Sequence, residues 1–246
     1  MINLIKNEFN KNFSKKQYLL LIFIIIILSL IYKYSHTIES FINTLHFIPP
    51  FIGIIISIYS SSIISKEYSS GTFKHYLTKP TKRWKIIISK IFYLFLLTIY
   101  YQLLTIFIYF LIILLTNNIE KINELLTIIK TFFKYSSPIY FIIFFSTYLS
   151  TILNNSKITS TISTILFITS MTISELLFTI KWTFIEYTFL PYMDLSIFSD
   201  LDNIKMINDI YNINLNIKTG NIILIIYSII FLILTLVIFK NKDIHN

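Results

Sequence analysis

Six long apolar stretches, separated by shorter polar segments, dominate the chain; they cover about 18–34, 47–65, 86–115, 132–153, 158–180 and 221–239. An α-helix rises 1.5 Å per residue, and about 20 apolar residues cross the hydrocarbon core of a bilayer. Each stretch is therefore long enough to cross a membrane as one helix. The third is longer than a crossing needs, so we expect it to tilt or to extend past the interface. The pattern predicts an all-α integral membrane protein with six transmembrane helices in one domain, 1–246.

The first segment, 1–17, predicts a helix that lies in the membrane interface. Ile2, Ile5, Phe9 and Phe13 recur at helical spacing, whereas Lys and Asn occupy the other positions around the helix. A frayed polar tail is the alternative. A basic start before an apolar run also resembles a signal peptide, but no small-residue cleavage pattern follows Leu30, so we expect the first span to be retained.

The distribution of charge predicts the topology, because Lys and Arg beside membrane spans are retained in the cytoplasm. With the N-terminus inside and six spans, 14 of the 21 basic residues fall on the cytoplasmic side, and nine of the 12 acidic residues fall on the other side. We therefore expect a multi-pass protein of the plasma membrane, in a bacterium, with both termini cytoplasmic. The basic residues counted inside are Lys6, Lys11, Lys15, Lys16, Lys66, Lys74, Lys79, Lys82, Arg83, Lys85, Lys90, Lys157, Lys240 and Lys242.

The composition supports this class and excludes several others. Hydrophobic residues make up 55% of the chain and charged residues 13%, which is far from the usual make-up of a soluble domain. The net charge of +9 follows from membrane orientation and attraction to anionic lipid, so no nucleic-acid partner is expected. Cysteine is absent and the four histidines are scattered. We therefore predict no catalytic, cofactor-binding or metal-binding residues in this chain.

The segment between the second and third stretches, residues 66–84, is the most informative. Glycine is scarce, yet Gly71 occurs here, and Pro80 follows nine residues later. Between them, 72–79 can form a short cytoplasmic helix with Ser70 or Thr72 as its N-cap. Its apolar face would carry Phe73, Tyr76 and Leu77. Such a helix is typical of a docking element for a cytoplasmic partner; a solvated loop is the alternative.

The same segment resembles the permease subunits of type-2 ATP-binding-cassette (ABC-2 type) transporters. The matching run comprises Glu67, Gly71-Thr72, Leu77, Pro80, Arg83 and Lys90. The resemblance implies that the short helix couples the permease to an ATPase, with the coupling residues Glu67, Gly71, Thr72, Phe73, Tyr76, Leu77, Pro80 and Arg83. It also implies a dimer, with itself or with a similar permease, bound to two cytoplasmic ATPase subunits.

Glycine occurs only at positions 53, 71 and 220, so the chain contains no phosphate-binding loop. We therefore expect a transporter subunit that is not an enzyme and binds no cofactor itself. ATP and Mg²⁺ would bind to the partner subunit. Glu67 is expected to pair with Arg83, with another nearby base, or with the N-terminus of the coupling helix.

Polar side chains within the spans suggest two further sites. The third stretch carries polar residues on one face, and this face is predicted to form either ordinary helix contacts or a substrate path or dimer seam. Its members are Thr98, Tyr101, Gln102, Thr105 and Tyr109. The fifth stretch is rich in Ser and Thr all around its helix, which suggests no preferred face. Glu175, near the outer end of that stretch, could meet water or take part in a proton relay.

The long segment 181–220 precedes the last span and is rich in aromatic residues. In the resembling family this region forms a pair of re-entrant helices on the extracellular side, and Pro191 would fit the turn between them. A plain extracellular loop is the alternative.

We expect the complex to export an amphipathic peptide, antibiotic or toxin, which would give self-protection or antibiotic resistance. Alternatives are an exporter of lipid-linked substrates or ions, and an ATP-independent secondary carrier or channel. A carrier would be expected to show intramembrane charges or discontinuous helices in matched halves, and we find neither in the sequence.

Overall fold

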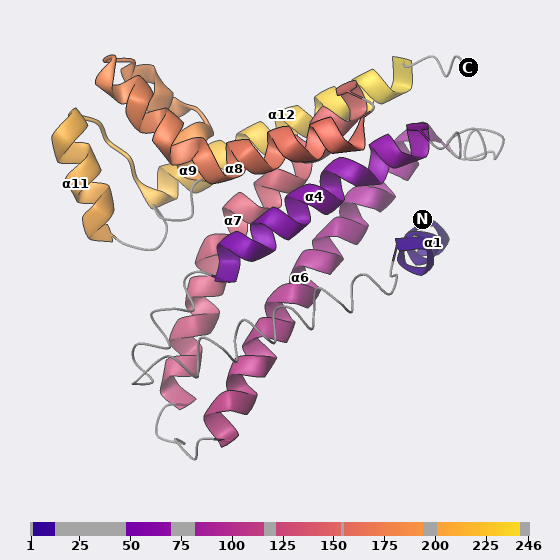
Figure 1. Ribbon diagram of the computed structural model, residues 1–246, viewed down its shortest axis with the longest axis horizontal. Coiled ribbons are helices and arrows are strands. Elements are labelled where there is room, and N and C mark those ends of the chain that lie inside the picture. Colours follow the sequence, from indigo (N-terminus) through magenta and orange to yellow (C-terminus); the bar gives the residue numbers. More distant parts are fainter. Residues whose placement is uncertain are drawn as a thin grey trace.

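A computed structural model describes residues 2–12, 48–69, 82–115, 122–153, 155–193 and 201–241. Within these ranges the chain is helical and contains no strand, which confirms the predicted all-α class for them (Figure 1). The long helices are α4 (Ile48–Ser69), α6 (Arg83–Leu115), α7 (Ile122–Leu153), α8 (Ser156–Thr179) and α12 (Ile217–Asn241). The shorter elements are α1 (Ile2–Asn12), the 3₁₀-helix η2 (Thr183–Tyr187), α9 (Leu190–Met193) and α11 (Leu201–Tyr211).

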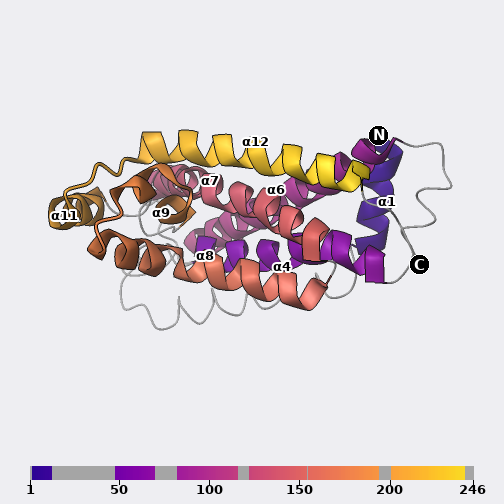
Figure 2. The same ribbon diagram turned by 90° about the horizontal axis from the view of Figure 1, so that it is seen from above.

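The helices form an elongated bundle in which α4 packs mainly against α7 and α8, and α12 packs mainly against α7. From above, α12 lies on one side of the bundle and α8 with α4 on the other (Figure 2). The hairpin of α6 and α7 diverges from α8 and α12 (Figure 1). Helix α1 and the last turn of α12 lie at the same end. This end also holds the end of α4 and the start of α6, and we call it the basic end for Lys66, Lys82, Arg83, Lys85 and Lys240.

Three segments of the described chain are long and apolar enough to cross a membrane: Arg83–Ile108, Ser136–Leu153 and Ile217–Asn241. A fourth is obtained if Ser156–Ser170 and Thr172–Thr179, which meet at a bend of 59°, count as one span. Helix α4 occupies the position of the second predicted span but is not among these segments. The first predicted span, 18–34, lies outside the described residues. The protein is thus a helical membrane protein, and the number of six spans stays a prediction.

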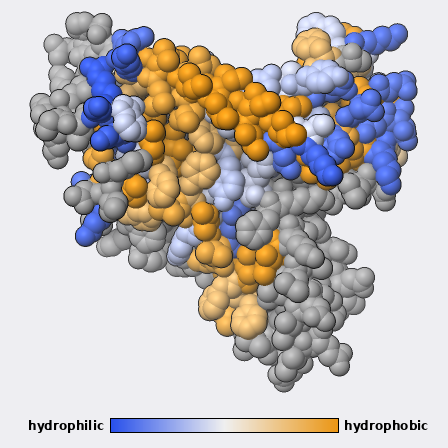
Figure 3. Space-filling model, turned by 180° about the vertical axis from the view of Figure 1, so that it is seen from behind, coloured by the Kyte–Doolittle hydropathy of each residue, from blue (hydrophilic) through white to orange (hydrophobic). Residues whose placement is uncertain are grey.

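The surface of the long helices supports the membrane assignment. On α12, one side exposes a continuous series of aliphatic residues that includes Ile222, Ile226, Ile230 and Ile233, each at least 42% exposed. Such a stripe would be costly in water but costs nothing against lipid. Figure 3 shows this apolar surface over the face on which α12 lies.

Serine and threonine hydroxyls fill the contact between α4, α7 and α8. The Ser150 hydroxyl of α7 accepts a hydrogen bond of 2.9 Å from the backbone N–H of Ser65, and Thr159 of α8 donates one of 3.3 Å to the carbonyl of Ser61. The chain contains no alanine, so these residues provide the short side chains that let helices approach closely. Buried members of this seam are Ser57, Ser60, Ser61, Ser65, Ser146, Thr147, Ser150, Thr151, Thr159 and Ser163.

Two of the three glycines are sites of close helix approach. A Cβ atom on Gly53 of α4 would lie 2.3 Å from Cζ of Phe167 in α8. A Cβ atom on Gly220 of α12 would lie 2.3 Å from Cδ1 of Tyr192 in α9. Each aromatic ring therefore occupies the space that any larger residue would need, and these contacts set the positions of α8 and α9.

The ends of α8 explain why this helix begins and stops where it does. Asn155 caps its start, because its side-chain Oδ1 accepts hydrogen bonds from the N–H groups of Lys157 and Ile158. At the other end the N–H of Lys181 bonds to Phe178 and that of Trp182 to Leu177, which is a Schellman motif. Lys181 therefore takes a left-handed conformation, with φ of 63°, at a position where glycine is usual.

The segment between α8 and α12 folds into short helices at the end opposite the basic end. Tyr192 and Met193 of α9 are buried against the bundle, and burial raises the pKa of the Tyr192 phenol above its usual value. The side chain of Asn208, in α11, bonds to both backbone groups of Leu215, at 3.0 and 2.8 Å. These bonds hold α11 next to the start of α12. We expected Pro191 to lie in the turn between two helices. It lies instead within α9.

Candidate functional site

A buried cluster of three charged residues joins α1, α4 and α6 at the basic end. The Lys90 ammonium group donates a hydrogen bond of 2.8 Å to Oε1 of Glu8 and lies 2.9 Å from Oε2 of Glu67. The side chains of Lys90, Glu8 and Glu67 are 0%, 2% and 5% exposed. We call these three residues the charge triad.

The electrostatics of the triad make it a strong structural link. A buried charge is costly to remove from water, and this cost is offset only by close, well-aligned partners. Glu67 is in the last turn of α4, where the negative end of the helix dipole disfavours a carboxylate by about 0.3–1 kcal/mol. The nearby ammonium group of Lys90 offsets this unfavourable interaction with the helix dipole. Removing Lys90 would take the ammonium group away from two buried carboxylates, whereas removing either glutamate would leave Lys90 close to the other one.

Helix α1 is held to α6 by more than the ion pair. The ring of Phe9 packs edge-on against Tyr93, with 4.9 Å between the ring centroids. Tyr93 is one helical turn beyond Lys90 on α6, and Phe9 is next to Glu8 on α1. The polar and aromatic contacts therefore attach one face of α1 along a single side of α6, while Lys6 and Asn7 remain exposed.

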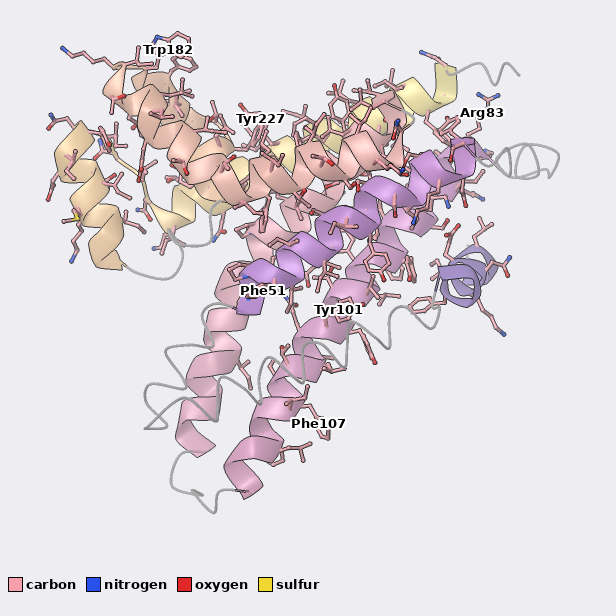
Figure 4. All side chains as sticks on the ribbon, in the orientation of Figure 1. Phe51, Arg83, Tyr101, Phe107, Trp182 and Tyr227 are labelled. Atoms are coloured by element: carbon pink, nitrogen blue, oxygen red, sulfur yellow. The ribbon has the colours of Figure 1, made fainter. Side chains whose placement is uncertain are left out.

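Two further contacts connect α12 to the same end. Arg83, the first residue of α6, donates a hydrogen bond of 2.9 Å from Nη1 to the carbonyl of Lys240 near the end of α12. This bond satisfies a carbonyl that the helix itself leaves without a partner. Tyr68 of α4 packs against Phe239 of α12, with 6.4 Å between ring centroids. Figure 4 shows Arg83 next to this end of α12.

The structure places only part of the predicted coupling segment. Gly71, Thr72, Phe73, Tyr76, Leu77 and Pro80 lie outside the described residues, so the coupling helix stays a prediction. Glu67 and Arg83 are described, at the two ends of that segment. We expected Glu67 to pair with Arg83, another nearby base or a helix N-terminus, and the structure pairs it with the nearby base Lys90.

The polar face of α6 is largely buried within the protein. Thr98, Tyr101 and Thr105 are at most 2% exposed, and Gln102 is partly buried; the side chain of Tyr109 is outside the described part. Both threonine hydroxyls donate to carbonyls of their own helix. The Tyr101 hydroxyl and Gln102 Nε2 are buried atoms that make no hydrogen bond to any residue in the described part of the chain. Among the described residues, helix packing therefore gives these two polar groups no hydrogen-bond partner. Figure 4 labels Tyr101 on α6.

Residues 25–245 match the protein family described as "Protein of unknown function (DUF2705)". The chain belongs to this family. A comparison with curated proteins gives no match.

The prediction about the hydroxyl residues of α8 can be compared with the structure of this DUF2705 member. We expected its hydroxyl residues to lie all around the helix, and they do, but only some of them face the protein: Thr159, Ser163, Ser170 and Ser174 are fully buried, whereas Thr161 and Thr172 are exposed. The buried set recurs at spacings of four, seven and four residues, which we had not separated from the surrounding serines and threonines. Glu175 is partly buried beyond the bend of this helix.

Sequence analysis also missed Glu8 and Lys90 as a pair. Glu8 lies three residues after Ile5 and next to Phe9, so it belongs to the apolar face of α1, and a carboxylate on that face signals a buried partner. Lys90 lies within the apolar stretch 86–97, where a charge is equally unusual. These two signals were available in the sequence; their partnership required the tertiary structure.

Proposed function

We propose that this DUF2705 chain is the permease subunit of an ATP-driven exporter of the ABC-2 type, which works as a dimer bound to two cytoplasmic ATPase subunits. The charge triad is the observation that carries this proposal. It ties the interfacial helix α1, the end of α4 and the start of α6 into one unit, and these ends of α4 and α6 flank the segment 70–81 in the sequence. A force applied to that segment would therefore move three helices together.

The contacts of Arg83 and Tyr68 extend this unit to α12. Closure of the ATPase pair on ATP would shift the equilibrium between two arrangements of the bundle, because nucleotide binding favours one of them. The serine seam between α4, α7 and α8 makes those helices follow, since it is tightly packed. The chain itself would bind no nucleotide.

The proposed orientation places the basic end in the cytoplasm of a bacterial cell, in agreement with the positive-inside rule. Segment 181–216 then lies on the extracellular side, and its short helices η2 and α9 would dip into the outer leaflet as a re-entrant pair. The cargo we favour is an amphipathic peptide, antibiotic or toxin, because the polar and aromatic face of α6 could bind a molecule that is part apolar and part hydrogen-bonding.

The test is to purify the tagged chain from its own cell in mild detergent and to identify what accompanies it. We expect an ABC-type ATPase, in equal number with the permease. The variant Phe73→Ser/Tyr76→Ser/Leu77→Ser should lose this ATPase while the protein still inserts in the membrane. Lys66→Met, a change of an exposed neighbouring charge, serves as the matched control. Recovery of the ATPase with the triple variant would reject the docking segment, and its absence from the wild-type preparation would reject the exporter.

A secondary carrier is the second candidate function. The charge triad gives it support that the sequence analysis had not found. We had found no intramembrane charges, yet Lys90, Glu8 and Glu67 form a buried charged group. Such groups mark proton paths in some carriers. Transport into inverted vesicles separates the two: an exporter needs ATP and works without a proton gradient, whereas a carrier needs the gradient and works without ATP.

A further inference from the structure

A groove of about 370 Å³ lies between α6, α7 and α12, on the face seen in Figure 3. Its walls are almost entirely apolar and include Phe95 of α6, Phe141 and Phe144 of α7, and Leu232 of α12. Hydroxyl groups are contributed by Ser136, Ser137, Tyr140 and Ser228. The volume is within the range of sites that hold small molecules.

The groove is continuous with the surface that faces lipid. Ile225 and Ile229 of α12 form part of its lining and are 57% and 52% exposed, so the groove opens along the aliphatic stripe of α12. A molecule entering it would come from the bilayer. We propose that this groove binds one hydrocarbon chain of a membrane phospholipid.

The chemistry of the lining distinguishes this occupant from a peptide. A peptide backbone carries an N–H and a carbonyl at each residue, and burying them without partners costs several kcal/mol in an apolar medium. The Ser228 hydroxyl already donates to the carbonyl of Leu224, so little of the wall can meet such groups. A hydrocarbon chain needs no partner.

The order of the lining residues also suits a lipid. Ser136 and Ser137 come two helical turns before Phe144, and Leu224 comes two turns before Leu232. The hydroxyls of the α7 serines are therefore at the end of the groove away from the basic end, where the ester region of a lipid in that leaflet would begin. The aromatic side chains lie deeper, along the path of the chain. This inference depends on membrane insertion and does not depend on the exporter proposal.

The experiment uses fluorescence quenching by phosphatidylcholine with brominated acyl chains, added in small excess to the full chain in detergent. The native tryptophans, Trp84 and Trp182, are both exposed and are first replaced by Phe. Phe144→Trp then reports on the groove, and Leu103→Trp reports on an exposed position of α6. We expect saturable quenching of the groove reporter at one lipid per chain, at least twofold stronger than at Leu103→Trp.

Filling the groove provides the decisive comparison. Ser228→Phe should abolish the stronger quenching of the Phe144→Trp reporter, whereas Ile226→Phe, on the exposed side of α12, should leave it unchanged. Equal quenching at the two reporters, or quenching that survives Ser228→Phe, would overturn the site. Absence of quenching in a chain that is dimeric through this face would show that a second copy covers the groove and would equally overturn it. Should Ser228→Phe fail to fold, Ser137→Phe fills the same groove from α7.

Discussion

Replacing Lys90 by Met removes the only described cation of the charge triad and leaves Glu8 and Glu67 buried. The two carboxylates are 2% and 5% exposed, so water cannot take the place of the ammonium group without opening the contact between α1, α4 and α6. Breaking a buried ion pair by removal of one partner typically costs about 3–5 kcal/mol. We expect Lys90→Met to lower the free energy of unfolding by that amount and to release α1 from α6.

Unfolding in mixed micelles, followed by circular dichroism, gives the stability change directly. Detachment of α1 can be measured separately because the chain lacks cysteine: a Phe9→Cys reporter should react faster with a water-soluble maleimide in the Lys90→Met background. The matched control is Lys66→Met, which removes an exposed charge next to Glu67 and should cost less than 1 kcal/mol.

The triple replacement of Lys90, Glu8 and Glu67 by Met tests the reasoning more sharply. Replacing a whole buried ion group by apolar residues of similar size is often neutral or even stabilising by about 1–4 kcal/mol. We therefore expect the triple variant to recover most of the stability that Lys90→Met loses. A triple variant as unstable as the single one, or a single variant as stable as the wild type, would refute the electrostatic account of the triad.

Three further changes test the packing and the ends of α8 by the same unfolding measurement. Gly53→Ala should destabilise by about 1–3 kcal/mol, because its Cβ atom would overlap the ring of Phe167, and Phe167→Leu should restore the loss; a stabilised Gly53→Ala would contradict the contact. Lys181→Gly should stabilise by about 1 kcal/mol, since φ there is 63°, whereas the same change at the helical residue Lys205 should destabilise. Asn155→Ala should cost about 1 kcal/mol by removing the N-cap, and an unchanged stability would show that the cap contributes nothing.

The positions of the long helices follow closely from hydropathy, because an apolar stretch that crosses a membrane must satisfy its backbone hydrogen bonds internally, and a helix does so. The predicted stretch 47–65 corresponds to α4, 86–115 to α6 and 221–239 to α12. The helices extend by a few residues at their polar ends, where hydropathy falls although the backbone hydrogen bonds continue. The fourth stretch, predicted at 132–153, begins ten residues earlier as a helix, at Ile122.

Contacts between helices were harder to predict from the sequence, because hydropathy gives the same value to a side chain that faces lipid and to one that faces another helix. In α8 the serines and threonines suggested no preferred face, yet Thr159 and Ser163 are buried, whereas Thr161, two positions from each of them, is exposed. The same limit applies to Gly53. Glycine is scarce in this sequence, which marks the position as unusual, but the ring of Phe167 that requires a glycine here lies more than 100 residues away in the sequence.

The triad shows what a closer physical reading of the sequence can contribute. An acidic residue on the apolar face of a helix and a lysine within an apolar stretch each carry a high cost of burial unless a partner of opposite charge is near. Glu8 and Lys90 are such residues, and Glu67 adds a carboxylate at the unfavourable end of α4. Opposite charges that are each unfavourable in their own helix are candidates to pair with each other. For Glu8, Glu67 and Lys90 this criterion leads from three isolated anomalies to one contact between α1, α4 and α6, which is the contact observed.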